Sequence, residues 1–171
     1  MKPGELRDLN VIGALALALA DDYTRAMEDL AEGNESACAA LIVIGQESGL
    51  SIDRLSKVLR LSQPGTVRLV DRLAEAKLVE RKSGADRRAV ALRLTDAGKR
   101  QVKALLVGRQ HALADALRGL DDWERSTLAA IAAKVLRGLD HSAVECDRRC
   151  RLCDDVSCPD ETCPMMQMAS T

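Results

Sequence analysis

The sequence predicts a mainly helical fold with one small β-hairpin, an α+β arrangement in which helices dominate. Apolar residues make up 47% of the 171 positions, which is enough to build a packed core. Aliphatic side chains recur at helical spacing along most of the chain, and only the segment 78–94 alternates apolar and polar residues as strands do. Aromatic residues make up 1%, which argues against the stacked platforms that bind single-stranded nucleic acid.

The N-terminal segment predicts a long helix rather than a secretion signal. Its apolar run at 11–19 is preceded by equal numbers of acidic and basic residues, so the positive region of a signal peptide is missing. The run is also too short to cross a bilayer. We therefore expect one buried helix from about Leu6 to Ala31, and a cytoplasmic protein with no membrane association, in which cysteines stay reduced.

The next segment predicts a helix that is buried on every side. It follows the break at Gly33-Asn34 and runs from about Glu35 to Ser48, and its stretch ACAALIVIG contains no charged residue. A helix without a polar face belongs in the interior of a domain. Cys38 is therefore expected to be a small core residue rather than a ligand.

Two short helices joined by a tight turn are expected next. Ser51 and Ser62 are suitable N-caps, and Pro64 fits the first turn of the second helix because its missing N–H has no helical partner there. The second helix directs four residues inward, which are Val67, Val70, Leu73 and Ala74. Its outward residues are Gln63, Thr66, Arg68 and Arg72. Such a pair of helices is a helix-turn-helix.

A β-hairpin is expected after these two helices. Its strands are predicted at 78–82 and 89–94, with the loop SGADRR between them. A helix-turn-helix followed by such a hairpin is a winged helix. The segment 51–103 carries fourteen Lys and Arg against six Asp and Glu, whereas the segments on both sides are net acidic. This pattern indicates a surface that faces a polyanion, with a merely solvated charged face as the alternative.

Two further helices are expected after the hairpin. Thr95-Asp96 caps the first, and a capping box at Asp121–Glu124 starts the second at Trp123. Long aliphatic stripes run along both helices, and they include Leu105, Leu113, Leu117, Leu128, Val135 and Leu139. A winged helix of about seventy residues cannot cover such stripes. A second copy of the chain is therefore expected to bury them.

The stretch LSQPGTVRLVDRLAEAKLVERKSGADRRAVALRLTDAGK resembles the MarR family of bacterial transcriptional regulators. It matches the family's recognition helix, strand, D-x-R wing and Leu-Thr-x-x-Gly exit, and the resemblance extends over about residues 6–140. The resemblance implies a homodimer that binds a near-palindromic DNA duplex, commonly as a repressor released by a ligand or by oxidation. It divides the chain into an N-terminal dimerisation helix (1–33), a winged helix-turn-helix (34–95), C-terminal dimerisation helices (96–140) and a cysteine-rich tail (141–171).

The resemblance also assigns DNA-binding roles residue by residue. The segment from Ser62 to Arg72 would form the recognition helix in the major groove, with Ser62 at its start. Its candidate contacts to bases and phosphates are Gln63, Thr66, Arg68 and Arg72. Asp86 and Arg88 match the wing motif, in which Asp orients an Arg that enters the minor groove, and Arg87 would meet a phosphate. The alternative for Asp86 and Arg88 is an ion pair that only closes the loop.

The tail contains five of the six cysteines. The spacing Cys150-x2-Cys153-x4-Cys158-x4-Cys163 resembles a zinc knuckle with cysteine in place of histidine. Four soft thiolates suit Zn²⁺ or an iron–sulfur cluster, and the spacing leaves that choice open. Cys146 is expected to be a spare, either a substitute ligand or a thiol that attacks an oxidised neighbour. Redox thiols without metal and unused cysteines are the alternatives.

The tail is expected to have almost no core of its own. Leu152 and Val156 are the only apolar side chains between its four clustered cysteines. We therefore expect metal binding to supply its folding free energy.

These features lead to one principal hypothesis and two alternatives. The principal one is a regulator without enzymatic activity, whose DNA binding responds to metal, iron–sulfur or thiol redox state at the tail. In the first alternative, a small aromatic or phenolic effector releases the DNA and the tail is structural. In the second, Cys150-Arg-Leu-Cys153 belongs to a thiol oxidoreductase, although the βαβ setting of such enzymes is missing.

Overall fold

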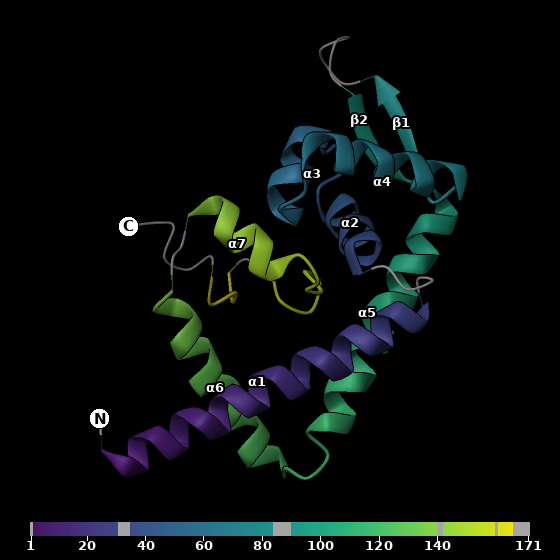
Figure 1. The fold of residues 1–171 in the computed structure, drawn as a ribbon. Helices are drawn as coiled ribbons and strands as arrows, with labels where there is room; N and C mark the ends of the chain where they lie inside the picture. Colours follow the sequence, from purple (N-terminus) through teal and green to yellow (C-terminus); the bar gives the residue numbers. More distant parts are fainter. Residues whose placement is uncertain (1, 31–34, 84–89, 140–141, 160, 166–171) are drawn as a thin grey trace.

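The computed structural model describes residues 2–30, 35–83, 90–139, 142–159 and 161–165. The elements within these ranges are α1 (Pro3–Leu30), α2 (Glu35–Gln46), α3 (Ile52–Leu59), α4 (Gln63–Glu75), β1 (Val79–Ser83), β2 (Val90–Leu94), α5 (Asp96–Ala116), α6 (Asp122–Arg137) and α7 (Ala143–Cys150). The hairpin projects from one end of the molecule, while α1, α6 and the far end of α5 form the other (Figure 1). The predicted mainly helical fold with a small hairpin is confirmed.

Helix α2 lies at the centre of the core. It contacts α1, α3, α4, α5 and β2. Helix α2 lacks a polar face because other elements surround it, as the sequence predicted. Cys38 is fully buried there, and its thiol donates to the Met27 carbonyl at 3.5 Å. The prediction that Cys38 is a core residue is confirmed. Other fully buried members of this core are Leu41, Ile44, Leu50, Leu55, Val70, Leu92 and Leu105.

The two helices of the predicted helix-turn-helix begin at their serine caps. The Ser51 hydroxyl accepts a hydrogen bond from the Arg54 amide at 3.2 Å, and the Ser62 hydroxyl accepts one from the Gly65 amide at 3.2 Å. Between the helices, Arg60 has φ of 52°, in the left-handed region. This backbone conformation ends α3 and turns the chain into α4.

The hairpin and the helix after it are tied to the end of α4. Strands β1 and β2 pair antiparallel from Val79 opposite Leu94 to Ser83 opposite Val90. Thr95 caps α5 by accepting from the Gly98 amide at 3.1 Å. A Cβ on Gly98 would lie 2.1 Å from the Leu78 carbonyl oxygen, so only glycine allows this close approach.

The outer helices are much less buried than expected. Helix α1 packs along α5, yet only Met27, near its C-terminal end, is buried among the side chains described in α1. The prediction of a buried first helix is wrong for the single chain, because the winged-helix core is too small to reach along its whole length. Among the described residues, no helix combines the length and apolarity that a membrane crossing requires.

Candidate DNA-binding surface and cysteine cluster

Helix α4 presents one polar face to solvent. Ser62, Gln63, Arg68 and Arg72 are exposed, whereas Leu69, Val70 and Leu73 face the core. Four of the five residues assigned to the recognition helix therefore lie where a DNA groove could reach them. Because the N-terminal part of such a helix contacts base edges, Gln63 and Arg68 occupy the positions with the best access.

Thr66 is the exception. It is fully buried, and its hydroxyl donates to the Ser62 carbonyl at 3.1 Å. The prediction that Thr66 faces outward is wrong. The hydroxyl of a threonine one turn into a helix can bond back to a backbone carbonyl, which leaves its methyl group free to pack inward.

The wing residues Asp86, Arg87 and Arg88 lie outside the described residues, so their assignment stays a prediction. Within the described hairpin, Arg81 of β1 forms a 2.8 Å ion pair with Asp71 of α4. This pair connects the wing to the recognition helix. Sequence reasoning missed it, since no local pattern links residues ten positions apart on a helix and a strand.

Four thiols of the tail lie close together. Cys150 ends α7, and Cys153, Cys158 and Cys163 follow it in the tail. All four line a cavity of about 300 Å³, which is also lined by Arg54 and Val58 of α3. The structure thus brings the four cysteines near one another, and the metal site expected of them stays a prediction.

Cys146 is hydrogen-bonded to the backbone of the tail. It is buried, as Cys163 is, and its thiol donates to the Met165 carbonyl at 3.6 Å. It lines the same cavity. This position is compatible with the predicted spare thiol.

The surroundings of Cys150 and Cys153 shift the pKa values of the two thiols in opposite directions. The hydrogen bond with Cys153 and burial both raise the pKa of the Cys150 thiol. The same hydrogen bond lowers the pKa of Cys153 to about 6, and the Arg109 guanidinium acts in the same direction. Burial raises the pKa of Cys158. Cys153 is thus the thiol most readily deprotonated, with Cys150 as its hydrogen-bond donor.

The donor set fits a soft metal by its chemistry, because thiolates are preferred ligands of zinc and of iron–sulfur clusters. In the arrangement seen here, the described residues contain no group of three or more His, Cys, Asp or Glu side chains placed to hold a metal ion. The thiols are therefore neighbours that line one cavity.

The tail is docked on the winged helix, a contact that the expected tail without a core of its own did not include. Leu152 is buried in the main hydrophobic core. The Gln46 side-chain amide donates to the Cys153 carbonyl at 2.9 Å, and Arg151 pairs with Glu35 at 3.1 Å. Packing and hydrogen bonds thus fix the tail, since α7 runs directly against α3.

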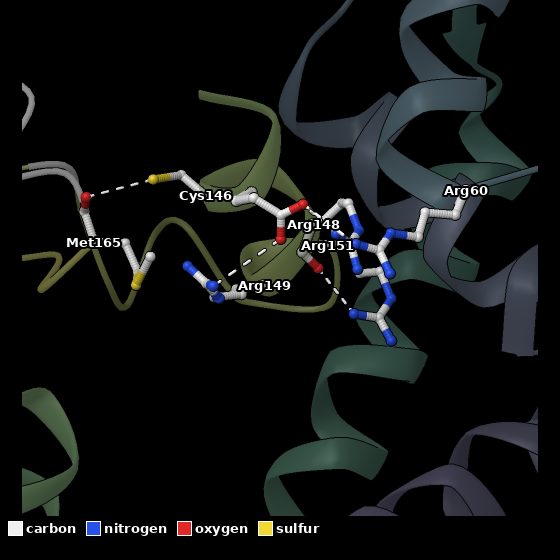
Figure 2. A network of polar contacts seen from close by, with 7 residues as sticks. Arg60, Cys146, Arg148, Arg149, Arg151 and Met165 are labelled. Atoms are coloured by element: carbon white, nitrogen blue, oxygen red, sulfur yellow. Dashed lines mark hydrogen bonds and ion pairs between the residues drawn. The ribbon is translucent and has the colours of Figure 1, made fainter. Parts of the chain in front are cut away.

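A carboxylate of α7 gathers three guanidinium groups. Glu145 pairs with Arg148, with Arg149 at 4.0 Å, and with Arg60 at 3.4 Å. Figure 2 shows these arginines converging beside α7, with Arg60 reaching in from the end of α3. Sequence reasoning gave Glu145 no role.

A second cavity lies between α2, α5, β2 and the tail. Its volume is about 450 Å³, and its lining is mostly apolar with two lysines and two aspartates, Asp154 and Asp155. The lining includes Ile42, Leu94, Lys99, Val102, Lys103 and Leu106. This composition suits a small molecule with an apolar body and a polar group.

The thioredoxin-like reading of Cys150-Arg-Leu-Cys153 does not fit this arrangement. Cys150 is the last residue of α7, and Cys153 lies in the turns after it. A redox motif of that type occurs in a βαβ unit. The sheet found in the described residues is the two-stranded wing, which lies elsewhere.

The chain is similar to several known proteins. Residues 34–89 match the model of the MarR family. An uncharacterised HTH-type transcriptional regulator of Bacillus subtilis (strain 168), YsmB, is 36% identical over 93 residues, which cover 54% of this chain and 61% of that protein. The match therefore spans less than two thirds of this curated relative.

Two solved structures share the fold. The YusO protein of Bacillus subtilis has a TM-score of 0.68 and 22% identity, over 81% of this chain and 100% of that one. The MarR family protein Rv2887 of Mycobacterium tuberculosis, in complex with salicylic acid, has a TM-score of 0.59 and 18% identity, over 73% of this chain and 93% of that one.

Proposed function

Because the chain belongs to the MarR family through its winged helix, we propose that it is a transcriptional regulator, acting as a repressor, that binds a near-palindromic DNA duplex as a homodimer. The observation that carries the proposal is the polar face of α4, on which Gln63, Arg68 and Arg72 stand exposed above a buried apolar face. Two such helices in a symmetric dimer match two half-sites of a palindrome.

We propose further that the cysteine cluster senses metal or oxidation. Four thiols gather in a cavity that α3 of the helix-turn-helix also lines, so a change at the thiols acts directly on the DNA-binding unit. Zinc or an iron–sulfur cluster would supply a structural or redox-sensitive centre, held by Cys150, Cys153, Cys158 and Cys163. Without metal, Cys150 and Cys153 can form a disulfide, giving two electrons and two protons to a peroxide that becomes water.

The first experiment identifies the centre. Protein purified without oxygen is examined for its visible spectrum, zinc, iron and sulfide. A coloured protein with iron and sulfide indicates a cluster, and a colourless one with zinc indicates a zinc site. If the protein contains neither zinc nor iron, the thiol mechanism without metal is the remaining explanation.

The second experiment tests sensing. A duplex selected from random sequences by the wild type is titrated with wild type, the Cys153→Ser/Cys158→Ser variant and the matched control Cys146→Ser, with and without peroxide or chelator. We expect the double variant to lose the response and the control to keep its metal. Identical responses from wild type and double variant would refute the sensor but leave DNA binding standing.

A small-molecule effector is the second candidate, favoured by the mostly apolar cavity of about 450 Å³, whose lining carries Lys99 and Lys103 together with Asp154 and Asp155. The relative Rv2887 was solved with salicylic acid, so an aromatic carboxylate is a suitable probe. Release of the selected duplex by salicylate, blocked in a cavity-filling Val102→Trp variant and retained in the double cysteine variant, would establish this effector in place of the thiol sensor.

A further inference from the structure

Where α7 contacts α3, two carboxylates of α7 form ion pairs with two arginines of the helix-turn-helix. Arg54, in the first turn of α3, pairs with Asp147 of α7 at 2.8 Å and with Glu47 at 3.0 Å. Arg60, directly after α3, pairs with Glu145 of α7 at 3.4 Å. Both acidic partners belong to the helix that carries Cys146 and Cys150, so the cysteine cluster and these ion pairs are built on one rigid element.

Arg60 has a position suited to a phosphate contact. It stands two residues before Ser62, the cap of the recognition helix, and its side chain is 68% exposed. The N-terminal end of a recognition helix is the end that approaches DNA, and neighbouring cations bind the phosphates on either side of the groove. In the present arrangement, the Glu145 carboxylate pairs with the Arg60 guanidinium, which would otherwise be available to a DNA phosphate.

Glu145 is well fixed in this position. Its side chain is 24% exposed, and two arginines of the same helix also pair with it: Arg148 with Oε1, the oxygen that Arg60 meets, and Arg149 with Oε2. These two pairs are local to α7, whereas the pair with Arg60 joins elements 85 residues apart in sequence. Glu145 can therefore keep its local partners when it releases Arg60.

We propose that α7 is an internal brake on DNA binding, in which Glu145 covers Arg60, a contact to the DNA phosphate backbone. The proposal rests on the DNA-binding function proposed above and names the route by which the tail controls it. A change at the thiols that shifts α7 away from α3 uncovers Arg60 and strengthens DNA binding. A change that fixes α7 more firmly keeps the cation neutralised and weakens binding.

The test is a double-mutant cycle in the reduced, full-length protein. Wild type, Glu145→Gln, Arg60→Ala and the double variant are titrated with a mixed-sequence DNA duplex, because phosphate contacts do not depend on sequence. We expect Glu145→Gln to tighten binding about two- to five-fold at low salt, the scale of one exposed ion pair. Arg60→Ala should weaken binding, and Glu145→Gln should have no effect in the Arg60→Ala background.

The matched control is Asp115→Asn, which changes net charge equally at an exposed position of α5. Thermal unfolding of each variant shows whether the fold is kept. A brake is refuted if Glu145→Gln leaves affinity unchanged, or tightens it equally when Arg60 is absent. If the wild type responds to peroxide but Glu145→Gln has no effect, only the brake is refuted. If no variant binds the duplex, the proposed function is refuted as well.

Discussion

The winged helix and the outer helices use the same aliphatic residue types with opposite results. In the winged helix, Leu55, Val70 and Leu92 are fully buried. In the outer helices, Leu17 of α1 is 68% exposed, and Trp123 and Ile131 of α6 are 74% and 56% exposed. None of the residues described in α6 is buried.

This difference teaches that the two regions depend on different partners. The winged helix wraps several elements around α2 and covers its own apolar surface. Helix α1 packs along α5. A groove where α1, α6 and the end of α5 meet is lined by Leu15, Leu117, Leu120, Trp123, Leu128 and Ile131. Because exposed apolar patches of this kind mark association sites, we propose that a second copy of the chain covers them.

The largest expected effect comes from the winged-helix core. Leu55→Ala should lower the free energy of unfolding by about 2–5 kcal/mol, because it leaves a cavity in a fully packed site. Urea denaturation followed by circular dichroism measures this loss. Ile131→Ala is the matched change in the outer region and should cost far less in the monomer. Equal losses for both would contradict the contrast between the regions.

The next effect concerns association of the outer helices. Ile131→Asp combined with Val135→Asp puts two charges on the exposed apolar side of α6 and should weaken the dimer by more than about tenfold, since burying unpaired charge is costly. Sedimentation across a concentration series gives the monomer–dimer equilibrium. Ser126→Asp, at an exposed polar position of the same helix, should remain dimeric. A dimeric double variant would place the interface elsewhere.

Substitutions on the exposed and the buried face of α4 should have smaller effects, and the two faces should differ in which property changes. Arg68→Ala should weaken the specific DNA complex by about 1–3 kcal/mol if the side chain contacts a base edge. Thr66→Val should leave DNA affinity unchanged, because the residue is buried, and should reduce stability by about 1 kcal/mol through its lost hydrogen bond. Filter binding and thermal unfolding distinguish the two outcomes. Loss of DNA specificity in Thr66→Val would restore its original assignment.

The smallest effect lies where the two regions meet. Tyr23 of α1 packs against the core, Arg109 lies 5.9 Å from its ring centre, and burial raises the pKa of Tyr23 to about 12. Its ordinary value is 10.0, so the unfolded chain loses this proton first. The stability that the neutral phenol contributes is therefore present below pH 10 and is lost as pH rises toward 12.

The Tyr23→Phe variant lacks the ionisable phenol, so it tests whether Tyr23 causes this loss of stability at high pH. The difference in melting temperature between wild type and Tyr23→Phe should shrink or change sign across this interval, because only the wild type contains the titrating phenol. A constant difference would show that Tyr23 does not titrate differently in the two states.

The sequence predicted the elements that depend on near neighbours. Ser51, Ser62, Thr95 and Asp121 each accept a hydrogen bond from the amide three residues ahead, as their positions indicated. The convergence of the tail cysteines also followed from short spacings. The recognition helix was located correctly, but the inward turn of Thr66 was not foreseen, because its hydroxyl can be satisfied by the backbone of its own helix.

Tertiary structure alone decided how the tail meets the rest of the molecule. Leu152 enters the main core, Gln46 binds the Cys153 carbonyl 107 residues away, and Glu145 reaches Arg60. Capping and helical periodicity are fixed by the geometry of a few consecutive residues, so the sequence displays them directly. Contacts between distant segments depend on how whole helices pack, and no local spacing of residues 145–153 records that α3 is the surface they meet.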